Sequence, residues 1–176
     1  MKDRIVGLYG PEILKKSAIS IRDGYGVLES IFADGCFSNV LEIGTYKGIG
    51  AACLSQWCEN VFTVDLIQGR MEHHQENFDR EEFWDSLGCK NIDLFLVKDN
   101  IEKASLIQTL DFDIAFIDGG KDDIAEDFEM VKHCGHVLFH DYDDRGQPAL
   151  NKVYDFVNSL PKEKVTITDI FALWTA

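Results

Sequence analysis

The chain has 176 residues, close to the commonest size of one domain. Its 17 Lys and Arg against 31 Asp and Glu give a formal net charge of −14, which repels nucleic-acid phosphates and anionic membrane surfaces. Neither is therefore expected as a partner. Apolar residues make up 45% of the chain, as in ordinary globular proteins. We expect one domain over residues 1–176, with helices in 1–37 and an α/β core in 38–176.

The amino-terminal sequence MKDRIVGLYG lacks the apolar run of a secretion signal, and no stretch of the chain approaches the ~18 consecutive apolar residues of a membrane span. The five cysteines are odd in number and contain no Cys-x-x-Cys pair, which argues against a disulfide framework or a zinc ribbon. We expect a cytoplasmic protein whose thiols act as small buried apolar groups.

Two helical patterns come first along the chain, over residues 11–16 and 22–32. The predicted strands of the core then cover residues 40–43, 61–64, 92–97, 112–117 and 137–139. The helices that follow them cover residues 49–57, 75–87, 101–109, 123–133 and 148–160. Two further β-prone runs, 165–170 and 171–175, have no helix between them and predict an antiparallel hairpin.

Short strands that are apolar on both faces and alternate with helices predict an α/β fold, with a doubly wound, mostly parallel sheet between two helix layers. A ligand of such a sheet lies beyond the carboxyl ends of the strands, so the residues that follow each strand form the candidate site. Within the helices, the charge run Arg80-Glu81-Glu82 is interpreted as a solvated face.

The first two strand ends indicate an adenosine-containing cofactor. The first strand leads into the turn Gly44-Thr45-Tyr46-Lys47-Gly48, whose glycines let the backbone approach a ligand. The second strand ends in Asp65, about twenty residues after Gly44, the separation at which an acid reaches the two hydroxyls of a ribose. Tyr46 occupies the place of the middle glycine of a dinucleotide-binding turn, which disfavours a nicotinamide-dependent oxidoreductase.

The other strand ends carry polar groups. Lys98-Asp99-Asn100 follows the third strand and can hydrogen-bond an adenine edge or cap the next helix. The fourth strand is followed by Asp118-Gly119-Gly120-Lys121 and the fifth by His140-Asp141-Tyr142-Asp143-Asp144. Carboxylates at two strand ends beside a lysine predict a cation site or a proton-transfer site. The alternatives are a solvated, ion-paired Lys121 and a His140 that is simply hydrogen-bonded at a strand end.

From about residue 38 to residue 176 the sequence resembles the class I S-adenosylmethionine-dependent methyltransferases, whose sheet is Rossmann-like with an antiparallel strand inserted near its end. VLEIGTYKG resembles the first motif of the small-molecule O-methyltransferases. TVD resembles the motif whose acid binds the ribose, and KDN the motif beside the adenine. FIDGGK and FHDYDD resemble the ends of the fourth and fifth strands of that family. The resemblance implies a cofactor site in three parts. The methionine part of the cofactor would be bound by Glu42, Gly44, Tyr46 and Gly48, the ribose by Asp65, and the adenine by Asp99 and Asn100. Asp118 would lie beside the cofactor.

Within that family the sequence is most similar to the metal-dependent catechol-type enzymes and to bacterial enzymes that methylate sugar hydroxyls of natural products. The catechol-type pattern implies Mg²⁺ on Asp118 and Asp141, with Lys121 as the base. His140 is a further candidate catalytic residue. Tyr142 replaces the asparagine of that pattern, so the third metal ligand would be Asp143 or Asp144. The sugar-modifying group more often has histidine at the position of Lys121, and His140-Asp141 is closer to its pattern.

The resemblance implies S-adenosylmethionine-dependent O-methylation of a small hydroxylated molecule, with or without Mg²⁺. The alternative is a catalytically inactive protein of the same fold that serves as a binding or oligomerisation module. Residues 1–37 and 143–147 are the only parts outside the cofactor-binding core and are too short to close a deep pocket. We therefore expect a homodimer, in which a second subunit supplies part of the wall.

Overall fold

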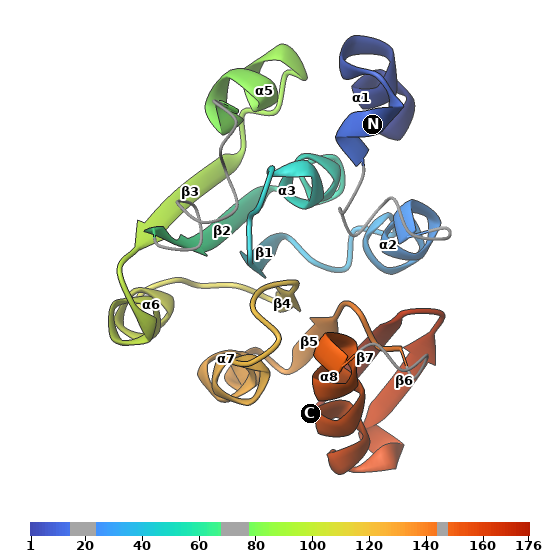
Figure 1. Ribbon diagram of the computed structural model, residues 1–176, viewed down its shortest axis with the longest axis vertical. Coiled ribbons are helices and arrows are strands. Elements are labelled where there is room, and N and C mark those ends of the chain that lie inside the picture. The colour runs from blue at the N-terminus through green and yellow to red at the C-terminus, as the bar shows by residue number, and fades with distance from the viewer. Residues whose placement is uncertain (15–23, 68–77, 144–147) are drawn as a thin grey trace.

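The computed structural model describes residues 1–14, 24–67, 78–143 and 148–176 (Figure 1). They form a seven-stranded sheet with the order β3-β2-β1-β4-β5-β7-β6. The strands are β1 (Asn39–Ile43), β2 (Asn60–Leu66), β3 (Ile92–Val97), β4 (Ile114–Ile117), β5 (His136–Phe139), β6 (Val165–Thr168) and β7 (Phe171–Thr175). The first five pair in parallel, whereas β7 is antiparallel to both β5 and β6. The predicted doubly wound, mostly parallel sheet with an antiparallel hairpin is confirmed.

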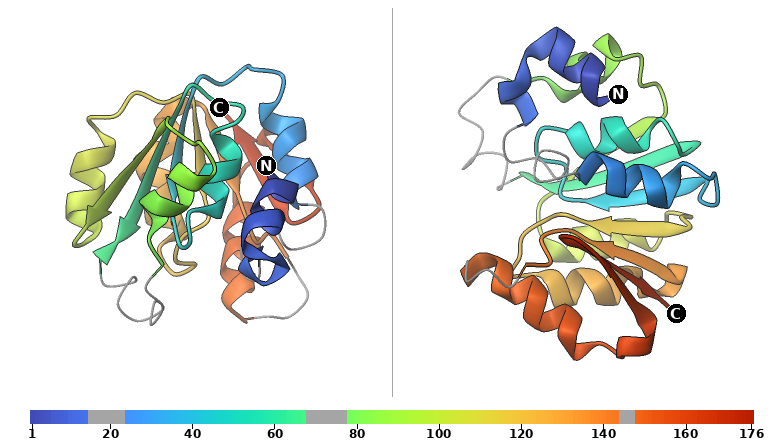
Figure 2. Two further views of the ribbon diagram at one scale, coloured as in Figure 1. Left: turned by 90° about the horizontal axis from the view of Figure 1, so that it is seen from above. Right: turned by 90° about the vertical axis from the view of Figure 1, so that its right-hand side faces the viewer.

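Helices cover both faces of this sheet (Figures 1 and 2). On one face lie α1 (Lys2–Tyr9), α2 (Gly24–Phe32), α3 (Ile49–Leu54) and α5 (Arg80–Ser86). On the other lie α6 (Asn100–Ile107), α7 (Ile124–Val131) and α8 (Pro148–Ser159). Figure 2 shows α1 and α8 at opposite ends of the molecule. No helix among the described residues is long and apolar enough to cross a membrane.

The strands are apolar on both faces because each face packs against its own helix layer. Neighbouring residues of a strand point to opposite sides of the sheet, so Val40 and Leu41 of β1 are both fully buried but belong to separate hydrophobic cores. Val40 packs in the core that includes Leu28 of α2, and Leu41 in the core that includes Phe128 of α7. This two-sided burial is the reason that a continuous apolar run marks each strand in the sequence.

The structure differs from the sequence-based prediction mainly at element ends. Lys2–Tyr9 is helical although its pattern is weak, because Ile5 is fully buried against the first core. The helix predicted over residues 11–16 is a 3₁₀ turn over Pro11–Leu14, and residues 15–16 lie outside the described part. The strand predicted from residue 112 begins at Ile114. Just before it, the Asp113 carboxylate accepts hydrogen bonds from the backbone N–H groups of Ser38 and Asn39.

A buried ion pair joins α6 to α7 on the second face. The ammonium of Lys103 bonds the carboxylate of Asp127, and the two side chains are 4% and 1% exposed. A charge taken out of water in this way is tolerated only while its partner is present. The pair therefore fixes how two neighbouring helices sit on the sheet beside the strand ends.

Replacing Lys103 by methionine is expected to lower the free energy of unfolding by about 3–5 kcal/mol, because it leaves the carboxylate of Asp127 buried without a counter-charge. Urea unfolding followed by circular dichroism measures this. The matched control is Lys90→Met, since Lys90 pairs with Asp85 at the surface, where a pair contributes about 0–1 kcal/mol. Adding Asp127→Leu to the Lys103 variant should recover most of the loss, and a double variant as unstable as the single one would contradict this explanation.

Candidate active site

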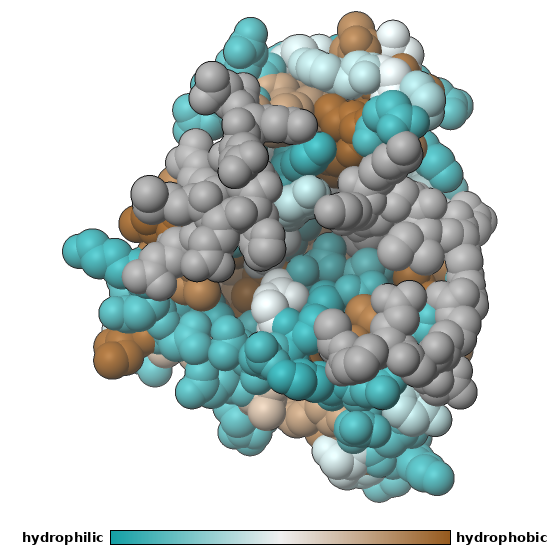
Figure 3. All heavy atoms as spheres, viewed as in Figure 1, coloured by the Kyte–Doolittle hydropathy of each residue, from teal (hydrophilic) through white to brown (hydrophobic). Residues whose placement is uncertain are grey.

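The predicted site residues of β1, β4 and β5 lie side by side at the carboxyl edge of the sheet. Backbone hydrogen bonds hold them there: the N–H of Gly44 donates to the Val64 carbonyl, that of Asp118 to the Ile43 carbonyl, and that of His140 to the Ile117 carbonyl. The order of the sheet reverses between β1 and β4, where a ligand-binding crevice is expected. Figure 3 shows hydrophilic residues gathered in the middle of this view, over the region of β1, β4 and β5 in Figure 1.

Glycine at position 44 is required by a close backbone contact. Gly44 has φ +99°, and a Cβ atom there would lie 2.5 Å from the Cα of Gly119. Any larger residue would therefore separate the chain that follows β1 from the chain that follows β4. The turn continues through Tyr46, which is in the left-handed region at φ +45°, to Gly48 at φ +71°. The indole of Trp84 packs on Gly48 and donates a hydrogen bond of 2.7 Å to its carbonyl.

Glu42 lies underneath this turn rather than at its surface. Its side chain is buried, accepts a hydrogen bond of 2.6 Å from the Thr63 hydroxyl, and fills the space where a Cβ of Gly50 would stand. Burial raises the pKa of Glu42 to about 8, and the nearby carboxylates of Asp118 and Asp65 add to this increase. At neutral pH the side chain therefore supports the turn as an uncharged hydrogen-bonding group.

Asp65 is tied to the glycine turn by a buried arginine. The Nη2 atom of Arg80 lies 2.7 Å from Asp65 Oδ2, and Nε of the same guanidinium donates to the Tyr46 carbonyl. Only 4% of the Arg80 side chain is exposed. The prediction that Arg80-Glu81-Glu82 is a solvated face is wrong for Arg80, whose side chain is buried in its pair with Asp65 at the start of α5. Glu81 and Glu82 are exposed, as predicted.

The predicted adenine-side residues divide between two tasks. Asp99 is exposed and caps α6, where its side chain accepts a hydrogen bond of 2.9 Å from the Glu102 N–H. Asn100 donates a hydrogen bond of 2.7 Å to Glu126. The Oδ1 atom of Asn100 is buried and has no hydrogen-bond partner among the described residues, and the role of Asn100 toward a cofactor stays a prediction. The role of Asp99 toward a cofactor stays a prediction.

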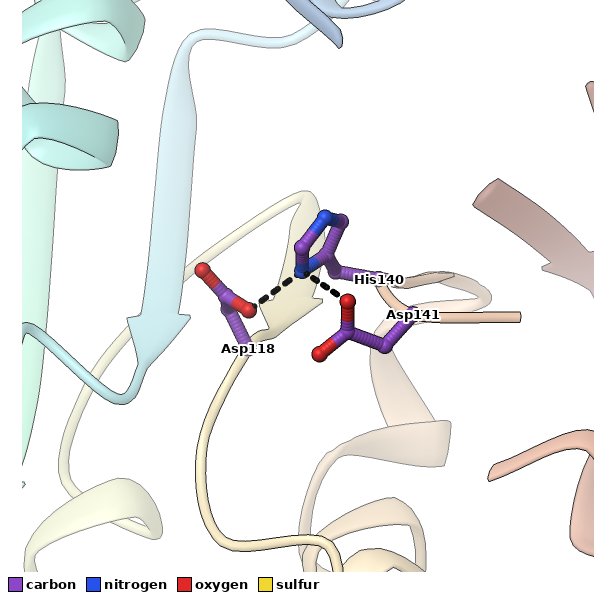
Figure 4. A group of neighbouring side chains, drawn as sticks. All are labelled: Asp118, His140 and Asp141. Atoms are coloured by element: carbon purple, nitrogen blue, oxygen red, sulfur yellow. Dashed lines mark hydrogen bonds and ion pairs between the residues drawn. The ribbon is translucent and has the colours of Figure 1, made fainter. Parts of the chain in front are cut away.

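Asp118, His140 and Asp141 form a compact group at the ends of β4 and β5 (Figure 4). The carboxylates point toward the imidazole, whose Nδ1 lies 2.6 Å from Asp118 Oδ1 and 3.3 Å from Asp141 Oδ1. The side chain of His140 is 4% exposed and packs against the ring of Phe171. Asp141 has φ +63°, a left-handed conformation that a non-glycine residue adopts at a cost.

Lys121 completes this group with a positive charge. Its Nζ atom lies 2.7 Å from Asp141 Oδ2 and 3.6 Å from Asp118 Oδ1. Burial alone would lower the pKa of Lys121, but the two carboxylates outweigh burial and raise it. Burial opposes the charge of Asp118 as well, yet His140 and Lys121 lower the pKa of Asp118 overall. The structure thus brings the four predicted residues together as an ion-paired cluster, and the role of Lys121 as a base stays a prediction.

No protein-family model matches the sequence, and no curated protein matches it. Solved structures do match. A Staphylococcus aureus protein provisionally described as a caffeoyl-CoA O-methyltransferase superposes with a TM-score of 0.69 over 99% of each chain, at 16% identity. A Bacillus cereus O-methyltransferase in complex with S-adenosylhomocysteine gives 0.64 over 100% of this chain and 91% of its own, at 15% identity.

The O-methyltransferase TomG from Streptomyces achromogenes, in complex with S-adenosylmethionine, has a TM-score of 0.62 over 86% of this chain and 78% of its own, at 17% identity. The chain has the methyltransferase fold. At such identities the likeness establishes the fold alone. The likeness to methyltransferases that the motifs predict is therefore confirmed at the level of the fold, and the residues of the site must support any function by their own geometry.

Of the two residues expected to supply the third metal ligand, Asp143 does not join the cluster. Among the described residues, the group that can surround a cation consists of Asp118, His140 and Asp141; Asp143 is buried but outside it. Tyr142, which stands in the place of asparagine, directs its hydroxyl to Asn158 on α8, 3.4 Å away. Asp144 lies outside the described residues.

The buried carboxyl of Glu42 is expected to make the protein less stable as the pH rises. The folded protein retains this proton up to a pKa of about 8, whereas the unfolded chain releases it near 4.5. Between these values the folded state binds more protons, so stabilisation that is complete below pH 4.5 is lost as the pH rises through 8. The contribution is about 1.4 kcal/mol per pH unit in this window.

Glu42→Gln keeps the shape and the acceptor but has no proton to lose. Its free energy of unfolding should fall less steeply than that of the wild type between about pH 5 and about pH 8, measured by urea unfolding at each pH. Glu59→Gln, at an exposed position, is the matched control and should follow the wild type. Parallel curves for wild type and Glu42→Gln would show that Glu42 is ionised when buried.

Proposed function

We propose that the protein is an S-adenosylmethionine-dependent methyltransferase that methylates a hydroxyl oxygen of a small molecule. The observation that carries this proposal is the division of one sheet edge into two halves, which meet where Gly44 contacts Gly119. The half at β1 and β2 holds the glycine turn and Asp65. The half at β4 and β5 holds the cluster of Asp118, Lys121, His140 and Asp141. A cofactor bound in the first half would present its methyl group toward the second.

The first half suits an adenosine-containing cofactor. Asp65 is held at the end of β2 with its carboxylate 17% exposed, and Asn100 offers a buried acceptor at the end of β3. The turn from Gly44 to Gly48 runs into the amino end of α3. The solved structures of TomG and of the Bacillus cereus enzyme contain S-adenosylmethionine and S-adenosylhomocysteine, respectively, which supports the same cofactor for this fold.

The second half suits the acceptor oxygen. In the reaction the bond from the methyl carbon to sulfur breaks, a bond from that carbon to the acceptor oxygen forms, and the hydroxyl proton leaves, giving S-adenosylhomocysteine and a methyl ether. The sulfonium already activates the methyl group, so the protein mainly brings the two reactants together in line. The ammonium of Lys121, held by Asp141, attracts the oxygen as negative charge develops on it. While Lys121 is the ammonium, the base that takes the proton is His140 beside Asp118; in the alternative, Lys121 is the free amine and acts as the base, and the developing charge then lacks this attraction.

The small hydroxylated acceptor, the cytoplasmic location and the homodimer are parts of this proposal that rest on the sequence. The catalytically inactive alternative has the same cofactor half and differs only in turnover. The two experiments below therefore distinguish an active methyltransferase from an inactive protein of the same fold.

Calorimetric titration with S-adenosylhomocysteine tests the cofactor half. The wild type should bind, and Asp65→Ala should lose about 10- to 100-fold in affinity, because charge-assisted hydrogen bonds contribute about 1.5–3 kcal/mol. The matched control is Asp111→Ala, an exposed aspartate before β4 at the opposite edge of the sheet. Absence of binding by folded wild type at about millimolar ligand, with or without Mg²⁺, would exclude the cofactor assignment.

Transfer of a labelled methyl group from S-adenosylmethionine to a panel of catechols and sugars tests the acceptor half. Lys121→Met should reduce turnover by about 10²–10³-fold, the effect of removing one preorganised positive group from the developing oxyanion, while binding of S-adenosylhomocysteine is retained. Lys132→Met is the control, because Lys132 pairs with Glu129 at the same i,i+3 spacing on the surface. A wild type that binds cofactor but methylates nothing in the panel would favour the inactive alternative.

A further inference from the structure

The position between the two carboxylates of the candidate active site is held by a side-chain cation. Lys121 Nζ lies 2.7 Å from Asp141 Oδ2 and 3.6 Å from Asp118 Oδ1, and these three side chains are between 15% and 20% exposed. A divalent ion bound by both carboxylates would have to lie within reach of the same oxygen atoms. It would meet the ammonium at a distance where like charges repel strongly in a partly buried site.

The imidazole of His140 is oriented as a donor rather than as a metal ligand. Its Nδ1 atom lies 2.6 Å from one carboxylate oxygen and 3.3 Å from another. Both neighbours are acceptors, so Nδ1 carries the hydrogen atom that satisfies them. A ring nitrogen that carries a hydrogen has no lone pair for a metal ion. His140 Nδ1, which hydrogen-bonds the carboxylates, is therefore not available to a metal ion, and the group of three residues keeps only its two carboxylates as ligands.

Among the described residues, no further carboxylate that could complete a magnesium shell joins this group. Mg²⁺ favours six oxygen ligands in near-octahedral geometry. Tyr142 replaces the asparagine of the metal-dependent pattern and hydrogen-bonds Asn158 on α8. Asp143 lies outside the group of possible ligands among the described residues. Within the described part of the chain, the group thus does not fit the Mg²⁺ site that the sequence pattern predicts.

We propose that the candidate active site operates without a resident divalent metal ion, with the ammonium of Lys121 in the place of that cation between Asp118 and Asp141. One negative charge remains on the group when His140 is neutral, and none when it is protonated. In this arrangement Lys121 supplies the positive charge that faces the acceptor oxygen, which is the task that a metal ion performs in a metal-dependent site. The link of this inference to catalysis rests on the proposed function. The ion pairs themselves are observed and do not depend on that function.

Electron paramagnetic resonance of Mn²⁺ added to the intact protein tests the inference. The wild type should show no stoichiometric Mn²⁺ site, and neither should Lys132→Ala, which loses a surface lysine of the same i,i+3 pairing. Lys121→Ala removes the ammonium and exposes both carboxylates, so it should bind one Mn²⁺ at least about tenfold more tightly than the wild type. Lys121→Gln serves as a second variant if the alanine variant is not folded by circular dichroism.

Adding Asp141→Asn to Lys121→Ala should remove the new site, because one of its two carboxylates is lost. One Mn²⁺ bound by the wild type, lost in Asp118→Asn and displaced by Mg²⁺, would overturn the inference. Failure of both Lys121 variants to gain a site would overturn it too, since the carboxylates would then hold no cation in the absence of lysine. Neither readout uses cofactor, so a protein that binds no S-adenosylhomocysteine would refute the proposed function and leave this result unaffected.

Discussion

The close contact between Gly44 and Gly119 is the constraint on which the rest of the site depends. The backbones that leave β1 and β4 approach so closely there that a Cβ on Gly44 would lie 2.5 Å from the Gly119 Cα atom. Because both chains pass through this point, the residues on either side have fixed positions relative to one another. Asp65 follows on the β2 side and Asp118 on the β4 side. A reaction between two bound molecules requires this kind of rigid separation, since misplacement by about 1 Å can cost about 100-fold in rate.

Four buried or half-buried acids lie at the carboxyl edge of the sheet, and their burial is compensated in different ways. Glu42 is held as a neutral, hydrogen-bonded group, whereas Asp65 is paired with Arg80. Asp118 and Asp141 share Lys121 and His140. These arrangements are local, whereas the net charge of −14 belongs to the whole chain. The overall charge therefore bears on solubility and partners, and the local pairs bear on chemistry.

The strand ends could be predicted from the sequence because local patterns determine them. An apolar run followed by Gly44, or by Asp118, marks the end of a strand, which is where a ligand of such a sheet is expected. This pattern is local and does not depend on distant parts of the chain. Arg80 and Trp84 could not be found in this way. Their partners, Asp65 and Gly48, are distant in sequence, and a helix beginning with charged residues looks the same whether its first turn faces water or the sheet. The cap formed by Asp99 was one of two predicted roles and is confirmed by the observed hydrogen bond to the Glu102 N–H, whereas the role of Asp99 toward a cofactor stays a prediction.

The two cations of the site differ in a way that matches the two halves of the edge. The guanidinium of Arg80 is planar and bonds two partners in fixed directions, the Asp65 carboxylate and the Tyr46 carbonyl, so it holds the cofactor half rigid. The ammonium of Lys121 is a point charge on a flexible stem, set between two carboxylates at unequal distances. It can shift toward an acceptor oxygen while one carboxylate remains within reach. In the proposed reaction, rigid support is useful where one invariant cofactor would bind, and an adjustable charge is useful where the acceptor would change from hydroxyl to ether.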